Sequence, residues 1–120
     1  MDQQISVLIV EPGKEPRLST VTGNLDTLQQ IVGGVIEVGC YLPQRVMLVC
    51  NSEGKNMDLP PNCLYPDDSG GFIYGTFLLC NFEGANFTSL TPAQQAQFQE
   101  YFALDRLNTV SPAATVGGQD

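Results

Sequence analysis

The chain of 120 residues contains no histidine and no tryptophan, and it has five basic residues against 13 acidic ones. Histidine is the commonest general base at neutral pH, so its absence excludes every catalytic triad that depends on it. The formal net charge of −8 repels phosphate backbones at long range, and nucleic acid is therefore not an expected partner. We expect a binding protein, not an enzyme, with no catalytic residue, no metal and no cofactor.

Long apolar segments are also missing. No run approaches the roughly 20 residues that a membrane span needs, and the start Met1-Asp-Gln-Gln lacks the basic residues of a secretory signal. The expected location is the cytoplasm of the cell that expresses the protein, with no membrane partner.

The four cysteines, at positions 40, 50, 63 and 80, include no close pair of the kind that opens most zinc sites. Cys50 and Cys80 end apolar runs, where a reduced thiol acts as a small buried hydrophobe. The even number leaves a disulfide framework open, although a cytoplasmic location argues against it.

With 42% hydrophobic and 15% charged residues, the chain is expected to fold. Its length fits one domain, predicted over residues 1–107. From Asn108 onward Ser, Pro, Ala and Gly dominate, which predicts a flexible tail over residues 108–120.

Apolar and β-branched runs predict strands over residues 5–10, 18–22, 35–38, 45–50 and 72–80. The first of these runs is apolar enough to be covered on both faces of the sheet. The first two are expected to form an antiparallel hairpin. One helix is predicted from a cap at Asn24 to Gly33-Gly34, and another from the cap Thr91 to about Asp105. Residues 56–71, rich in proline and glycine, predict an irregular loop. The expected fold is α+β: a mostly antiparallel, twisted sheet of about five strands with two helices packed on one face.

Several motifs are spread along the chain: Ser6–Pro16, Leu25, Leu28, Gln29, Ile31–Glu37, Val49–Lys55, Leu59-Pro60 with Asn62, and Gly75–Phe77. Together they resemble a known family, the small proteins called domain of unknown function 3846. The resemblance implies a protein of bacteria, their phages or conjugative elements, and it implies no particular activity. Many members carry basic residues after the Asn of the Leu-Pro segment, where this chain has Cys63-Leu64-Tyr65, so a phosphate clamp carried over from them would be incomplete.

Polar residues at predicted strand ends are the candidate ligand-binding set: Glu11, Lys14, Arg45, Asn51, Lys55, Asn62, Gly75 and Thr76. Asn offers a donor and an acceptor to a base or ribose, Lys and Arg offer charge to a phosphate, and Gly lets backbone amides approach. The tyrosines at positions 41, 65 and 74 offer stacking faces. The predicted partner is a small nucleotide-derived molecule, and open sheet edges predict a homo-oligomer.

The favoured function is a phage or mobile-element accessory protein that sequesters such a molecule, for example a cyclic nucleotide or cyclic ADP-ribose made as a host immune signal. The alternative is an acidic inhibitor or DNA mimic that binds a host defence or DNA-binding protein. A third hypothesis, a carboxylate-metal phosphodiesterase, requires convergence of several acids among Glu11, Glu37, Asp58, Asp67 and Asp68.

Overall fold

The computed structural model describes residues 3–67 and 69–103. The predicted tail over residues 108–120 lies outside them. The elements, in chain order, are β1 (Gln4–Val10), β2 (Arg17–Thr22), α1 (Leu25–Val32), β3 (Ile36–Leu42), the short 3-10 helix η1 (Pro43–Arg45), β4 (Val46–Asn51), β5 (Pro61–Leu64), β6 (Phe72–Tyr74), β7 (Phe77–Glu83), β8 (Asn86–Thr88) and α2 (Pro92–Tyr101).

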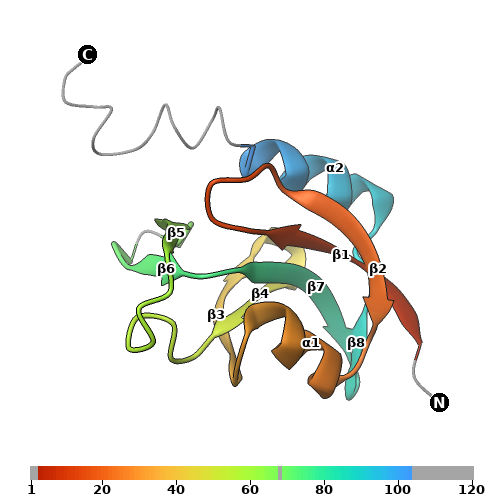
Figure 1. Ribbon diagram of the computed structural model, residues 1–120. Helices are drawn as coiled ribbons and strands as arrows, with labels where there is room; N and C mark the ends of the chain where they lie inside the picture. The colour runs from red at the N-terminus through yellow and green to blue at the C-terminus, as the bar shows by residue number, and fades with distance from the viewer. Residues whose placement is uncertain (1–2, 68, 104–120) are drawn as a thin grey trace, which may run out of the picture.

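Five strands form the main sheet in the order β2-β1-β7-β4-β3, and β8 adds to β7 (Figure 1). Every described strand pair is antiparallel. The predicted hairpin is confirmed, because β2 pairs with β1 from Gln4 opposite Thr22 to Ile9 opposite Arg17. Strands β5 and β6 form a separate two-stranded sheet at one end of the main sheet. The predicted α+β class with a mostly antiparallel sheet is therefore confirmed.

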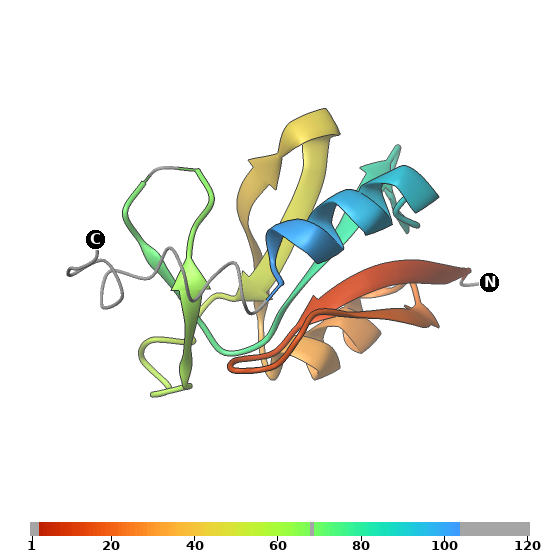
Figure 2. The same cartoon turned by 90° about the horizontal axis from the view of Figure 1, so that it is seen from above.

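The two helices lie on opposite faces of the main sheet, so their expected placement on one face is wrong (Figure 2). Helix α1 contributes Leu28 and Val32 to a core that includes Val7, whereas Phe98 of α2 and its C-cap residue Phe102 belong to a core that includes Leu8. Successive residues of a strand point to opposite faces. Because β1 is apolar at both sets of positions, each face needs a cover, and one helix covers each.

Side-chain caps fix where the helices begin, as predicted. The Asn24 Oδ1 accepts the Thr27 amide at 2.8 Å, and α1 ends at Gly33, where φ is +84°. At α2, the Thr91 hydroxyl accepts the Gln94 amide at 3.1 Å while the Gln94 side chain accepts the Thr91 amide at 2.9 Å. The end predicted near Asp105 lies outside the described residues. No helix in residues 3–67 and 69–103 is long and apolar enough to cross a membrane.

Three local predictions are corrected. The strand predicted over residues 35–38 extends as β3 to Leu42, with a register shift between Val38 and Cys40 that marks a bulge at Gly39. The predicted strand over residues 72–80 is two strands, since the chain leaves β6 at Gly75, where φ is +86°, before β7 begins. The predicted irregular loop contains β5, and β8 was not predicted because three residues carry too weak a pattern.

Candidate functional site

Most of the predicted site residues gather at one end of the main sheet. Val10, at the end of β1, pairs with Phe77, at the start of β7, and β4 ends beside them because Val49 pairs with Leu78. This register brings Asn51, at the end of β4, together with the turns that hold Glu11, Lys14, Lys55, Gly75 and Thr76, and Asn62 joins them from β5. The ends of β1 and β4 and the start of β7 thus form one surface.

Arg45 does not belong to this surface. It is exposed in the turn before β4, with φ +65°, at the end of that strand opposite to Asn51. Six residues of strand separate the two ends by about 20 Å. The structure therefore does not bring Arg45 together with the other residues of the predicted binding set, because β4 runs from Arg45 at one end of the sheet to Asn51 at the other.

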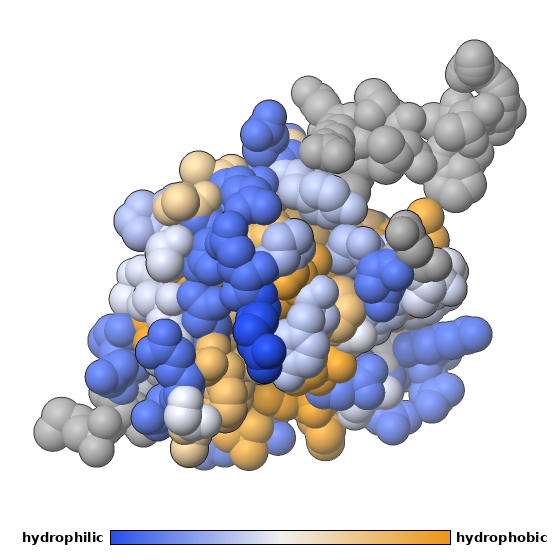
Figure 3. All heavy atoms as spheres, turned by 180° about the vertical axis from the view of Figure 1, so that it is seen from behind, coloured by the Kyte–Doolittle hydropathy of each residue, from blue (hydrophilic) through white to orange (hydrophobic). Residues whose placement is uncertain are grey.

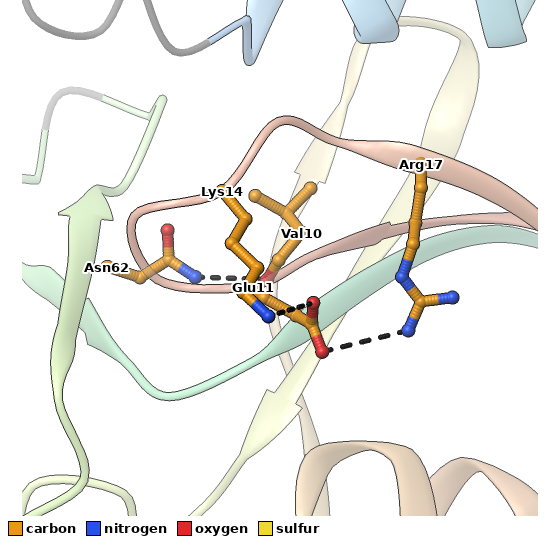
Figure 4. A network of polar contacts seen from close by, with 5 residues as sticks. All are labelled: Val10, Glu11, Lys14, Arg17 and Asn62. Atoms are coloured by element: carbon orange, nitrogen blue, oxygen red, sulfur yellow. Dashed lines mark hydrogen bonds and ion pairs between the residues drawn. The ribbon is translucent and has the colours of Figure 1, made fainter.

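Asn62 ties the small sheet to the main sheet. Its Nδ2 donates to the Val10 carbonyl at 3.0 Å and to the Gly75 carbonyl at 2.9 Å, and the first of these bonds is drawn in Figure 4. The Gly75 amide in turn donates to the Pro60 carbonyl at 2.7 Å. A Cβ on Gly75 would stand 2.7 Å from Leu59 Cδ1. Asn62 and Gly75 therefore hold the junction of the two sheets, and half-buried Thr76 follows as the first residue toward β7.

Glu11 and Lys14 form a charged cluster with Arg17 in the β1–β2 hairpin (Figure 4). A Glu11 carboxylate oxygen lies 3.8 Å from Lys14 Nζ, and its second oxygen lies 3.7 Å from Arg17 Nη2. The Lys14 side chain is 71% exposed. Exposed ion pairs of this length contribute at most about 1 kcal/mol, so the cluster is a surface feature that leaves both cations accessible.

Asn51 is a structural residue. It is buried, and its Nδ2 donates to the Val32 carbonyl at the end of α1 at 3.2 Å, while its Oδ1 accepts the Glu53 amide at 2.7 Å. A weaker contact of 3.7 Å joins Nδ2 to Met57 Sδ. Its donor and acceptor are therefore committed to α1 and to the turn after β4.

A pocket of about 160 Å³ lies between the end of β4 and the small sheet. Among its lining residues, Lys55 carries the one positive charge and Glu37 the one negative charge. The walls are Glu37, Cys50, Asn51, Ser52, Gly54, Lys55, Tyr65, Phe72, Ile73 and Tyr74. Of the predicted binding set, the pocket thus brings together only Asn51 and Lys55.

Aromatic residues supply the part of the pocket that the predicted set omitted. The rings of Phe72 and Tyr74 lie 5.9 Å apart between centroids. Tyr65 covers Gly39, where an added Cβ would stand 2.6 Å from its ring, and its hydroxyl lies 3.5 Å from Cys50 Sγ. Tyr65 and Tyr74 are two of the tyrosines predicted as stacking faces. In the sequence, Gly39 is the feature that indicates a close approach of another group to β3, here the Tyr65 ring.

All four cysteines are free, and Cys50, Cys63 and Cys80 are buried. Burial raises the thiol pKa to about 12 at Cys63 and Cys80. Burial and then the Asp67 carboxylate raise the pKa of Cys40 to about 11. Burial also raises the pKa of Cys50, partly offset by its hydrogen bond to Tyr65, whose own pKa is raised first by burial. Protonated thiols at neutral pH are poor nucleophiles and poor metal ligands.

The described carboxylates of the metal hypothesis do not converge. Within residues 3–67 and 69–103, no three Cys, Asp or Glu side chains come close enough to hold a metal ion. Asp67 is fully exposed, and its pKa is lowered by hydrogen bonds from Ser69. Asp68 lies outside the described residues, and Glu11 and Glu37 stand in separate places, the ion-pair cluster and the pocket wall.

An antiparallel α+β domain whose sheet end carries a small polar and aromatic pocket is the class that the fold and the site define. The family model described as "Domain of unknown function (DUF3846)" matches residues 5–103. The chain therefore belongs to the DUF3846 family. Comparisons with curated proteins and with solved structures gave no match.

Proposed function

We propose that this protein binds and sequesters a small nucleotide-derived molecule without changing it chemically. The observation that carries the proposal is the pocket, which combines the Lys55 ammonium with the rings of Tyr65, Phe72 and Tyr74. An ammonium group attracts a phosphate, and an aromatic face stacks on a base, so the two kinds of group together suit a nucleotide. Glu37 adds acceptors for the amino groups of a base.

The size of the pocket limits how a ligand is held. Sites that enclose a whole small molecule usually measure about 300 to 1,000 Å³. A pocket of about 160 Å³ therefore takes one part of a nucleotide, such as a base or a phosphate, and the rest extends over the rim. A sequestering protein acts stoichiometrically and needs affinity only, which agrees with a chain that has no histidine. In this proposal the protein is an accessory factor of a phage or mobile element, and its ligand is an immune signal of the host.

The test exposes purified protein to a panel of cyclic dinucleotides, cyclic trinucleotides and cyclic ADP-ribose, followed by filtration that retains the protein. Free nucleotides in the filtrate are quantified by mass spectrometry before and after the protein is heat-denatured. We expect one class to disappear from the filtrate and to return intact on heating. A species that returns altered would instead establish an enzyme.

A panel that stays entirely in the filtrate would contradict the proposal and would favour the acidic inhibitor of a basic protein. That alternative rests on the net charge of −8. It predicts an association that weakens steeply with added salt, because charge pairs at an interface rim are screened.

A further inference from the structure

Strand β3 is an edge of the main sheet with an exposed apolar stripe. Among the described strands it pairs with β4 alone. Val38 and Tyr41 are 43% and 60% exposed, and Ile36 is half-buried. These three residues share the α1 face, because they pair with Asn51, Val49 and Met47 of β4, of which the last two belong to the α1 core. Figure 3 views the molecule from the side of β3 and β4, and hydrophobic surface gathers over the lower part of this side.

The two edges of the main sheet differ in character. The opposite edge strand, β2, has the sequence RLSTVT, which begins with a cation and carries three hydroxyl residues. Strand β3 has the sequence IEVGCYL, with neither lysine nor proline and with Glu37 as its one charge. Edge strands that are not meant to pair usually carry such charges or prolines. The features of this kind in β3 are the charge of Glu37 and the bulge at Gly39, which brings no side chain to the edge.

We infer that β3 is the interface of a two-fold symmetric dimer, in which it pairs antiparallel with β3 of a second copy. A two-fold interface must be self-complementary, and β3 is so in the register centred on Val38. In this register Gly39 is left unpaired, as it is in the pairing with β4. Val38 then lies opposite the partner's Val38, and Ile36 lies opposite the partner's Tyr41. Glu37 then faces the partner's Cys40, so no like charges oppose each other, although each chain carries a net charge of −8.

This dimer also brings the two pockets together, which is the part of the inference that rests on the proposed function. Glu37 lines the pocket, and Tyr65 lines it from above Gly39. In the register centred on Val38, the partner's Gly39 and the partner's Tyr65 come next to Glu37. Two small pockets then adjoin across the two-fold axis on the α2 face of the combined sheet. A cyclic dinucleotide, whose two halves are related by the same symmetry, is the ligand class that such a double site fits.

The first test is the molar mass of the full chain without ligand, measured by size-exclusion chromatography with light scattering over a dilution series. We expect twice the chain mass of 13.0 kDa for the wild type and a monomer for Val38→Lys. Thr20→Lys is the matched control, because it places the same charge on the exposed part of β2, and it should remain a dimer. A monomeric wild type, or a Val38→Lys variant that remains a dimer with native circular dichroism, would overturn the inference.

The second test fixes the register by cross-linking. Val38→Cys places two thiols opposite each other across the axis, where diamide should convert most of the protein to a covalent dimer. The control Val35→Cys is 61% exposed but lies three residues from the axis, so its two copies are about 20 Å apart and should not cross-link beyond the wild-type background. Equal cross-linking of both variants would overturn the register.

The third test separates the dimer from the proposed function. Titration with cyclic diguanylate and cyclic diadenylate should saturate at one molecule per two chains for the wild type and should lose at least tenfold in affinity for Val38→Lys. Saturation at one per chain would refute the shared site. If neither compound binds while the mass and the cross-link are as expected, the dimer stands and the cyclic dinucleotide assignment fails.

Discussion

The buried amide of Asn51 gives the sharpest test of how the end of β4 is built. In the variant Asn51→Asp the acceptor for the Glu53 amide remains, but an oxygen replaces the nitrogen that donates to the Val32 carbonyl at 3.2 Å. The change keeps the size and shape of the side chain. It therefore isolates one hydrogen bond and one charge.

The cost at neutral pH follows from three contributions of the same sign. The Val32 carbonyl loses its donor, and a carboxylate is placed at a site that is only 5% exposed. The negative end of the α1 dipole also lies beside that carboxylate. Together these should lower the free energy of unfolding by about 2 to 4 kcal/mol at pH 7. The folded-state pKa of the introduced carboxyl must then be raised above its unfolded value. The stability of the variant is therefore greatest below the unfolded pKa of about 3.9 and is lost as pH rises. Its free energy of unfolding should come closer to that of the wild type as pH falls toward 4.

The assay is urea denaturation followed by circular dichroism at several pH values between about 4 and 8. The matched control is Asn56→Asp, because Asn56 bonds an exposed Glu53 oxygen at 2.8 Å and should change stability far less. If Asn51→Asp is as stable as wild type at pH 7, or if its deficit does not depend on pH, the assignment of Asn51 as a structural residue is refuted.

Two further predictions concern the sheet junction and the buried thiols. Asn62→Ala removes the bonds to the Val10 and Gly75 carbonyls and should cost about 2 kcal/mol in urea denaturation, and a loss below about 0.5 kcal/mol would show that the junction does not depend on it. Since burial raises the pKa of Cys80 from 9.0 to about 12, the folded state keeps a proton that the unfolded state releases, and stability is lost as pH rises across this interval. Wild-type stability should therefore fall more steeply than that of Cys80→Ala, by about 1.4 kcal/mol per pH unit, and equal slopes would contradict the burial of this thiol.

Much of the fold was accessible from the sequence because its signals are local. The caps at Asn24 and Thr91 and the stop at Gly33 fix the helices, and the apolar run before Glu11 fixes β1. The placement of the helices was missed although β1 itself predicted a cover on both faces. The sequence predicts β6 and β7 as a single strand, because no pattern within residues 72–80 shows that the first three residues pair with β5 and not with the main sheet.

The candidate site was only partly predictable, for a physical reason. Position at a strand end does not tell at which end of the sheet a polar residue lies, and for that reason the sequence did not show that Arg45 lies away from the rest of the predicted set. Residue type also does not tell whether an amide is already used: Asn51 and Asn62 satisfy backbone groups far away in sequence. The pocket walls from Glu37 and Phe72 depend on the packing of two sheets, which no local pattern encodes.

The most direct test of the central claim, that the pocket binds a nucleotide-derived molecule, compares Lys55→Ala with Lys14→Ala in the filtration assay with the same panel of cyclic nucleotides and cyclic ADP-ribose. Both changes remove one exposed positive charge from the same end of the sheet, but only Lys55 lines the pocket. We predict that Lys14→Ala depletes the same species as the wild type, whereas Lys55→Ala leaves it in the filtrate with at least tenfold weaker binding. Equal depletion by both variants would place the binding site elsewhere and would contradict the account.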